Sequence, residues 1–195
     1  AIITDFREKA ADGEVQIIKD PTEPEELFLL LNNGKPPFDD IRARKAVAHS
    51  IDTERYLEVF GEGISEPATG PFPPSSPWYV ESGWQGYDLD LAKEMVADYE
   101  AEKGPLVVEY LATNNPEDRD TLGLLEEMMG EAGIEVESRA VDQGSLILDA
   151  VGGNFEMAFW RQWSAPDPDG DYLWWHSSSA RPVGEFSLNL GRVQD

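Results

Sequence analysis

The sequence contains no cysteine, and its 195 residues include two histidines and six lysines. Without cysteine the chain has no disulfide, no thiol chemistry and no cysteine-based zinc site. No apolar run approaches the ~18 residues that a membrane-spanning helix requires. Hydrophobic residues nevertheless make up 41% of the chain. That share is sufficient for a core, so a folded domain is expected rather than a disordered segment.

Positive charge is also scarce, because 15 lysine and arginine residues stand against 39 aspartate and glutamate residues, for a net charge of −24. A surface of this sign repels nucleic-acid phosphates and anionic lipids, so neither is expected as a partner. The acid excess has two interpretations. One is a highly soluble acidic surface; the other is adaptation to high salt, where screening removes the repulsion between carboxylates. The low lysine content fits the second.

The first part of the chain combines strand, helix and loop patterns. Residues 13–20 and 26–33 are rich in Val, Ile, Leu and Phe, and each predicts a short strand. Residues 39–48, with an aspartate as N-cap, and residues 53–60 predict two helices. The segment 61–86 carries five prolines and five glycines, which predicts a long irregular loop. Its aromatic side chains indicate that this loop packs on the domain rather than hanging free.

From residue 88 onwards, helix and strand patterns alternate. A helix is expected at 88–104, followed by strands and helices in turn: strands at 106–113, 134–142 and 155–163, and helices at 116–133, 143–154 and 169–178. Repeated strand–helix–strand units with short connections imply right-handed crossovers. The expected fold class is therefore α/β, a mostly parallel sheet covered by helices.

Motifs of catalysis are missing from this pattern. The sequence lacks the serine-hydrolase elbow, the zinc-peptidase helix and the phosphate-binding loop. His49 is interpreted as a structural residue of its helix, and carboxylate pairs follow from composition. The chain is therefore not expected to be an enzyme. A free-standing α/β enzyme domain remains the alternative, and a carboxylate pair with displaced pKa values in a closed pocket would favour it. A third possibility, an interaction domain, would show a large apolar patch outside any cleft.

The stretch "DPDGDY" (167–172) resembles the beginning of a calcium-binding loop, with aspartates at alternate positions. The match fails further on, because Tyr172 stands where glycine is required and Ser178 where a bidentate glutamate is required. No metal and no cofactor are expected. Asp169 or Asp171 is instead expected to cap the following helix.

Five segments resemble, in the right order, those of the family 5 extracellular solute-binding proteins, the peptide-, oligopeptide- and nickel-type receptors of ABC importers. They are "LLLNNGKPPFDDIRARKAVAHSID", "PATGPFPPSSPWY", "YDLDLAKEMVADYEAEKG", "GLLEEMMGEAGIEVE" and "FEMAFWRQWSAPDPDGDYLWWHSS". The resemblance extends from Gly13 to Leu190. It implies a lobe like those of type II periplasmic binding proteins, which closes with another lobe over a small solute.

The resemblance also implies an organisation and a place in the cell. Residues 1–35 would be hinge or inter-lobe strands, residues 36–190 the second lobe, and residues 191–195 a truncated tail, with the first lobe missing. The partners would be a solute (a peptide, sugar or metal complex), the first lobe and an ABC permease. The location would be extracytoplasmic, in the periplasm or at the outer face of the membrane, with or without a lipid anchor.

The tryptophans of the last predicted strand are the main candidates for the ligand site. Trp160 and Trp163 are three residues apart, so they cannot both point to the same face of a strand. One is expected to pack into the core and the other to form a flat wall for a ligand; the alternative is that both pack. The resemblance favours Trp163 as the ligand-facing residue, with Ser164 and Asp167 beside it.

The polar groups that would hold a peptide depart from the pattern of the family's peptide receptors. Peptide receptors of this family carry an aspartate about three residues after this tryptophan, where the present sequence has Pro166. The resemblance thus implies that the anchor for an amino group is missing or has moved to Asp167, which leaves room for sugars, opines or other solutes. Arg119 is a candidate for binding a carboxylate, and an ordinary surface charge is the alternative for it and for Arg161.

Overall fold

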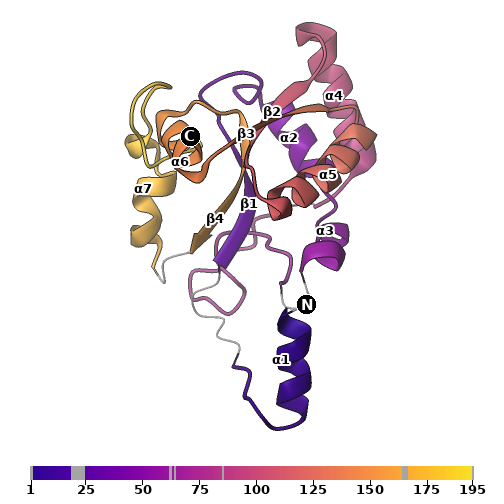
Figure 1. Cartoon of the computed structure of the whole chain (residues 1–195). Helices are drawn as coiled ribbons and strands as arrows, with labels where there is room; N and C mark the ends of the chain where they lie inside the picture. Colours follow the sequence, from indigo (N-terminus) through magenta and orange to yellow (C-terminus); the bar gives the residue numbers. More distant parts are fainter. Residues whose placement is uncertain are drawn as a thin grey trace.

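The protein is described by a computed structural model that covers residues 2–18, 25–61, 63, 65–84, 86–163 and 167–194 (Figure 1). Its helices and strands follow in this order: α1 (Ile2–Ala11), β1 (Glu25–Leu31), α2 (Ile41–Ser50), α3 (Thr53–Phe60), α4 (Leu89–Lys103), β2 (Val107–Thr113), α5 (Pro116–Glu131), β3 (Glu135–Val141), α6 (Gln143–Gly152), β4 (Met157–Trp163), the 3₁₀ turn η1 (Pro168–Asp171), α7 (Tyr172–Trp175) and the 3₁₀ turn η2 (Ser177–Ser179).

The four strands form one sheet in the order β1-β4-β2-β3. Strand β2 lies in the interior and pairs in parallel with both β3 and β4, whereas β1 pairs antiparallel with β4. The expected α/β fold with a mostly parallel sheet is therefore confirmed. The antiparallel β1 adds a strand from the beginning of the chain to the edge formed by β4.

Helices cover both faces of this sheet (Figure 1). On one face α2, α4 and α5 enclose a core with the inward side chains of β2, among them Tyr110 and Val108. On the other face α6 and the segment after α7 pack on Leu111, Ala158 and Leu30. Adjacent residues of a strand point to opposite faces, so Tyr110 and Leu111 enter different cores. Both faces of the sheet are apolar for this reason.

The helices begin where the sequence offers a cap. The following residues precede a helix and accept a backbone N–H of its first turn: Asp40, Asp52, Asp88, Asn115 and Asp142. Each cap satisfies a donor that the first turn leaves without a partner. At the other end of α6, Gly153 has a φ of 73°, which a residue with a Cβ rarely adopts.

The predicted strand at 13–20 is wrong for residues 13–18; residues 19 and 20 lie outside the described residues. Residues 13–18 have no strand structure, and α1 precedes them. Ile17 and Ile18 are exposed, at 53% and 78%. A strand requires a neighbour for its backbone hydrogen bonds, and within the described ranges no strand pairs with these residues.

The predicted loop at 61–86 is confirmed as irregular over its described residues. Part of it packs on α2, since the ring of Trp84 stacks on His49 at 4.7 Å. Nδ1 of His49 also lies 2.8 Å from the carbonyl oxygen of Gly86. His49 is 5% exposed, and these contacts agree with the structural role expected for it.

Gly191 and Arg192, near the end of the described chain, are buried in the domain. Arg192 is 1% exposed, and its guanidinium donates to the carbonyl oxygens of Val151 (2.9 Å), Glu185 (3.1 Å) and Asn189 (2.9 Å). Val151 lies in the last turn of α6, where carbonyl groups point out of the helix without intrahelical partners. Separately, none of the helices in the described ranges has the length and apolar character needed to cross a bilayer.

Candidate ligand-binding site

Trp163 is the last residue of β4, and its side chain is 67% exposed. Strands β2 and β4 are parallel, so their carboxyl ends lie at the same edge of the sheet. Ligands of open α/β sheets bind beyond that edge. Across the antiparallel pair the partner of Trp163 is Glu25, the first residue of β1. An exposed aromatic ring and a carboxylate are thus neighbours at this edge.

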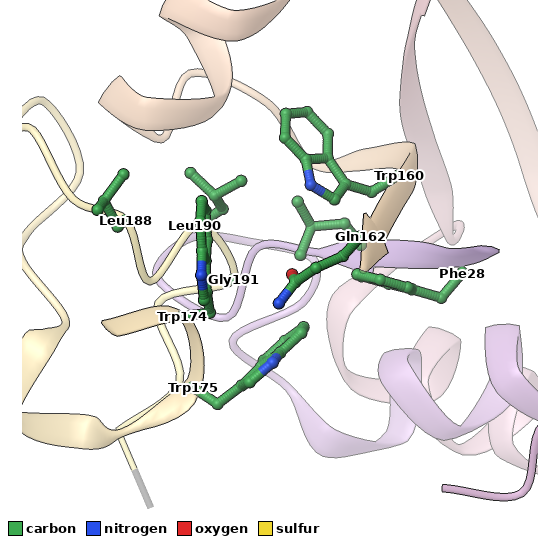
Figure 2. Close-up of a pocket in the computed structure, with 9 residues that line it drawn as sticks. Phe28, Trp160, Gln162, Trp174, Trp175, Leu188, Leu190 and Gly191 are labelled. Atoms are coloured by element: carbon green, nitrogen blue, oxygen red, sulfur yellow. The ribbon is translucent and has the colours of Figure 1, made fainter. Parts of the chain in front are cut away.

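Trp160 points to the other face of β4 and belongs to an aromatic cluster (Figure 2). The cluster also contains Phe28 of β1, which is the cross-strand partner of Trp160, and Trp174 and Trp175 of α7. Phe28 and Trp175 lie 5.6 Å apart, measured between ring centroids. The free space among these rings is about 10 Å³, which is close to the minimum for one water molecule. This arrangement favours packing for Trp160, as expected for one of the two tryptophans.

Arg161 lies on the same face of β4 as Trp163, two residues away, and its guanidinium faces two carboxylates. Its Nε is 3.5 Å from Oε1 of Glu25, and its Nη2 is 3.9 Å from Oε1 of Glu117. Glu117 belongs to the first turn of α5. The side chain of Arg161 is 52% exposed, so each pair contributes little to stability. Two carboxylates and one guanidinium leave this rim with a net negative charge.

Arg119 lies near the end of the neighbouring strand, in the first part of α5. Its side chain is exposed, and Nη1 donates to the carbonyl oxygen of Asn114 at 3.2 Å. Asp118 accepts hydrogen bonds from the backbone N–H and hydroxyl of Thr113, the last residue of β2. These contacts hold the turn between β2 and α5 and leave Arg119 at the surface of the same sheet edge.

Of the remaining two candidates, Ser164 and Asp167, the structure describes Asp167 alone. Ser164 lies outside the described residues, as does Pro166. Asp167 is exposed, and it caps the turn η1 by accepting the backbone N–H of Asp169 at 2.9 Å. Asp171 stands at the N-cap position of α7 but makes no side-chain hydrogen bond there, so the side-chain cap expected from Asp169 or Asp171 is wrong. The chain forms a separate 3₁₀ turn before the helix, and that turn takes the cap.

Two carboxylates of this edge were not predicted from the sequence. Glu25 reaches Trp163 only through the pairing of β1 with β4, which joins residues 138 positions apart. No local pattern indicates such a register. Glu117 follows Asn115 and Pro116, which mark the beginning of a helix. The sequence thus placed Glu117 at a helix start, without indicating that Arg161 would face it.

Several charged side chains elsewhere in the described part of the chain form helix caps and ion pairs. Among the described residues no three His, Asp or Glu side chains lie together as metal ligands. The side-chain hydrogen bond from Arg42 lowers the pKa of Asp40 to about 2, and hydrogen bonds from Ser145 lower the pKa of Asp142. Burial alone would raise the pKa of Asp149, but hydrogen bonds from Arg139 and Asn154 lower it overall. All three shifts come from caps and ion pairs.

The sequence profile of the bacterial extracellular solute-binding proteins, family 5 (middle region), matches residues 2–184. The chain belongs to this family. Among curated proteins, it is 29% identical over 175 residues to a protein of Pseudomonas aeruginosa named "Probable di/tripeptide-binding protein 5", covering 86% of this chain and 32% of that one. It is 23% identical over 149 residues to the glutathione-binding protein GsiB of Pectobacterium atrosepticum, covering 74% and 29%.

Solved structures show the same fold. HbpA2 from Haemophilus parasuis superposes with a TM-score of 0.83 at 19% identity, over 99% of this chain and 38% of that one. The oligopeptide-binding protein AppA from Bacillus subtilis, solved with a nonapeptide, gives 0.76 at 19% identity, over 98% and 40%. This family 5 chain thus spans about a third of the length of the curated relatives it matches, for example 32% of the Pseudomonas protein.

Proposed function

We propose that this chain is one lobe of the solute-binding component of an ABC importer, and that Trp163 forms part of its ligand-facing edge. The observation that carries the proposal is the position of Trp163. In a family 5 chain, this ring is 67% exposed at the carboxyl edge of two parallel strands. Exposing a tryptophan to water costs free energy in the unliganded lobe, and a ligand or a second lobe that covers the ring recovers it.

The solute is proposed to be a peptide or a related small molecule. The names of two relatives support this class, since one is a di/tripeptide-binding protein and another binds glutathione. The acidic rim of Glu25 and Glu117 supports a solute that carries an amino group. The two carboxylates, together with Asp167, would pair with this amino group and so take over part of the role that the resemblance assigns to the missing aspartate.

The lobe is proposed to act by closure rather than by chemistry. Residues 36–190 would form the lobe, residues 1–35 would connect it to the first lobe, and binding would stabilise the closed state. Trp163 would cover one side of the solute, with Ser164 and Asp167 beside it and Arg119 at the neighbouring strand. The closed receptor would then meet a permease outside the cytoplasm. The pKa shifts of caps and ion pairs described above give no support to the alternative of a carboxylate-based enzyme.

Calorimetric titration with dipeptides and tripeptides tests this function. We expect the two-lobed receptor, in which this chain is joined to the proposed other lobe, to bind such peptides with micromolar or tighter affinity. The 195-residue chain supplies half a cleft, and we expect no binding tighter than millimolar. Tight peptide binding by the chain alone that Trp163→Ala abolishes would contradict the proposed division of the site between two lobes.

A pair of variants tests the site itself in the completed receptor. Trp163→Ala is expected to weaken peptide binding at least about tenfold, because the ring loses its contact with the solute. Trp78→Ala removes another exposed ring, 47% exposed, from the irregular segment that follows α3. This control is expected to change affinity less than about twofold. If the two substitutions changed peptide affinity equally, Trp163 would not be part of the ligand site.

A further inference from the structure

Helix α7 has two faces with different surroundings. Trp174 and Trp175 contact the aromatic cluster around Trp160 described above. Tyr172 and Leu173 instead line a second, open groove, together with η2 and the segment that follows it. This groove is a different depression from the aromatic cluster, and the proposed function does not use it.

Three of the residues that line the groove are apolar or aromatic and strongly exposed. Phe186 is 70% exposed, Leu173 53% and Tyr172 46%. The ring of Tyr172 is held in place because it stacks on His176 at 4.3 Å and its hydroxyl shares a 2.6 Å hydrogen bond with Oγ of Ser178. Exposed apolar side chains around a depression are typical of surfaces that bind an apolar group. A fixed aromatic wall loses little conformational entropy when such a group binds.

Arg181 is the charged residue among the described residues that line the groove. Its Nη1 donates to the carbonyl oxygens of Ser178 at 2.9 Å and of Ala180 at 2.7 Å. These two bonds fix the plane of the guanidinium. Within the described residues, Nε and Nη2 of Arg181 make no hydrogen bond, and no carboxylate forms an ion pair with it. Four other arginines of this acidic chain pair with carboxylates (Arg42, Arg55, Arg139 and Arg161), whereas Arg44 and Arg119, like Arg181, donate to carbonyl oxygens.

The open edge of the guanidinium has a defined chemical preference. Two parallel N–H groups at Nε and Nη2 match the two oxygens of a carboxylate, and such bidentate pairs are shorter and stronger than neutral hydrogen bonds. The nearby hydroxyls are already engaged, since Oγ of Ser178 contacts Tyr172 and Nδ1 of His176, and Oγ of Ser179 donates to the carbonyl oxygen of His176. Recognition of a charged group would therefore depend on Arg181.

We propose that the groove between α7 and the segment around Phe186 binds an organic carboxylate that carries an apolar group. The carboxylate would accept two hydrogen bonds from Arg181, and the apolar group would pack on Phe186, Leu173 and the ring of Tyr172. This chemistry occurs in small apolar acids and at the C-terminus of a peptide with an apolar last residue. The inference is independent of the solute site at Trp163, so either can fail without the other.

A titration followed by NMR tests the groove directly. N-acetyl-phenylalanine is added to the 195-residue chain, and the Nε–H signal of Arg181 is observed together with backbone signals of residues 172–188. The net charge of −24 repels anions at long range, so the titration uses about 0.3 M salt, where the screening length is shorter than 8 Å. Saturable shifts with a millimolar Kd are expected, as is normal for a ligand of this size.

The uncharged N-acetyl-phenylalaninamide is the matched ligand control and is expected to bind at least about tenfold more weakly, because it lacks the second acceptor oxygen and the charge. Arg181→Lys keeps a positive charge but loses the planar fork, and a loss of about tenfold is expected. Phe186→Ala removes the exposed apolar wall and is expected to weaken binding severalfold. Arg7→Gln, an exposed arginine of α1 that also donates to a carbonyl oxygen, is expected to change nothing.

Three results would overturn the proposal. The first is the absence of a saturable shift at ligand concentrations up to ~10 mM. The others are equal affinities for the acid and the amide, and an unchanged affinity in both Arg181→Lys and Phe186→Ala. Because Phe186 and Arg181 are exposed, both variants are expected to fold, and their melting temperatures verify this. The same titration with a tripeptide ending in phenylalanine distinguishes the two sources. Tighter binding than N-acetyl-phenylalanine assigns the groove to peptide C-termini, and weaker binding assigns it to small acids.

Discussion

Glu25 lies directly opposite Trp163 in the antiparallel pair of β1 and β4. This pairing brings a carboxylate from the beginning of the chain to the exposed ring at the end of the last strand. The register is set by the apolar residues farther along the pair, where Leu30 faces Ala158 in one core. A slip by one residue would turn these side chains to the wrong faces of the sheet. The core therefore determines which groups meet at the candidate site.

The two tryptophans of β4 are expected to differ in their effect on stability. Trp160→Ala removes a ring from the aromatic cluster and is expected to lower the free energy of unfolding by about 2 kcal/mol or more. Trp163→Ala removes a ring that is 67% exposed, and a change within about 0.5 kcal/mol is expected. Urea unfolding followed by circular dichroism measures both. A larger loss for Trp163→Ala would show that this ring packs in the fold and is not free for a ligand.

Arg192 is expected to be essential for the stability of the domain. Its guanidinium is buried, and burial lowers its pKa. Arg192→Met keeps much of the volume but leaves the carbonyl oxygens of Val151, Glu185 and Asn189 without this donor. A loss of about 3 kcal/mol is expected in the free energy of unfolding. The exposed Arg7→Gln serves as the control, and a similar loss in both would assign the effect to net charge instead.

Asp40 is expected to contribute to stability at neutral pH and to lose this contribution in acid. The side-chain hydrogen bond from Arg42 lowers its pKa from 3.8 to about 2. A lowered pKa means that the stabilisation is complete above the unfolded value and disappears as the pH falls from about 4 to about 2. Asp40→Ala also loses the cap of α2 and is expected to cost about 1 kcal/mol at pH 7.

The variant Asp40→Asn separates charge from capping. Asparagine caps a helix about as well as aspartate, so this variant is expected to keep the cap and lose only the ion pair with Arg42. Its melting temperature is expected to depend less on pH between 4 and 2 than that of the unmodified chain. An identical pH dependence in both proteins would exclude Asp40 as one of the groups responsible.

Tyr110 is expected to tolerate the loss of its hydroxyl. The side chain is fully buried, and within the described residues its hydroxyl makes no hydrogen bond of normal geometry. Burial also raises the pKa of this phenol. Tyr110→Phe removes a polar group that gains nothing in the fold, so the free energy of unfolding is expected to stay equal or rise by up to about 1 kcal/mol. A clear loss in thermal unfolding would indicate that the hydroxyl does have a partner.

The melting temperature of the chain is expected to rise with potassium chloride. With a net charge of −24, the folded state holds its carboxylates closer together than the unfolded chain does. Molar salt reduces the screening length to about 3 Å and weakens this repulsion. Calorimetry between about 0.05 M and 2 M salt measures the effect. A melting temperature that stays constant or falls would argue against adaptation to high salt.

Much of the fold could be predicted from the sequence because its signals are local. Asp88 and Asn115 mark helix starts by their ability to cap, and the alternation of apolar residues marks β2 to β4. The stretch 13–18 shows the limit of such signals, since its apolar residues predicted a strand that has no partner to pair with. The exposure of a ring at the end of β4 was expected from strand period and resemblance together.

The sequence by itself determined the order of helices and strands from β1 to β4, the acidic surface and the resemblance to a family, since each depends on neighbouring residues or on composition. Only the tertiary structure decided that Glu25 and Glu117 meet Arg161 beside Trp163, and that Arg181 and Phe186 line the same groove. The physical reason is that contacts between distant residues depend on strand register and on how α7 packs. These are properties of the whole core and not of any local stretch.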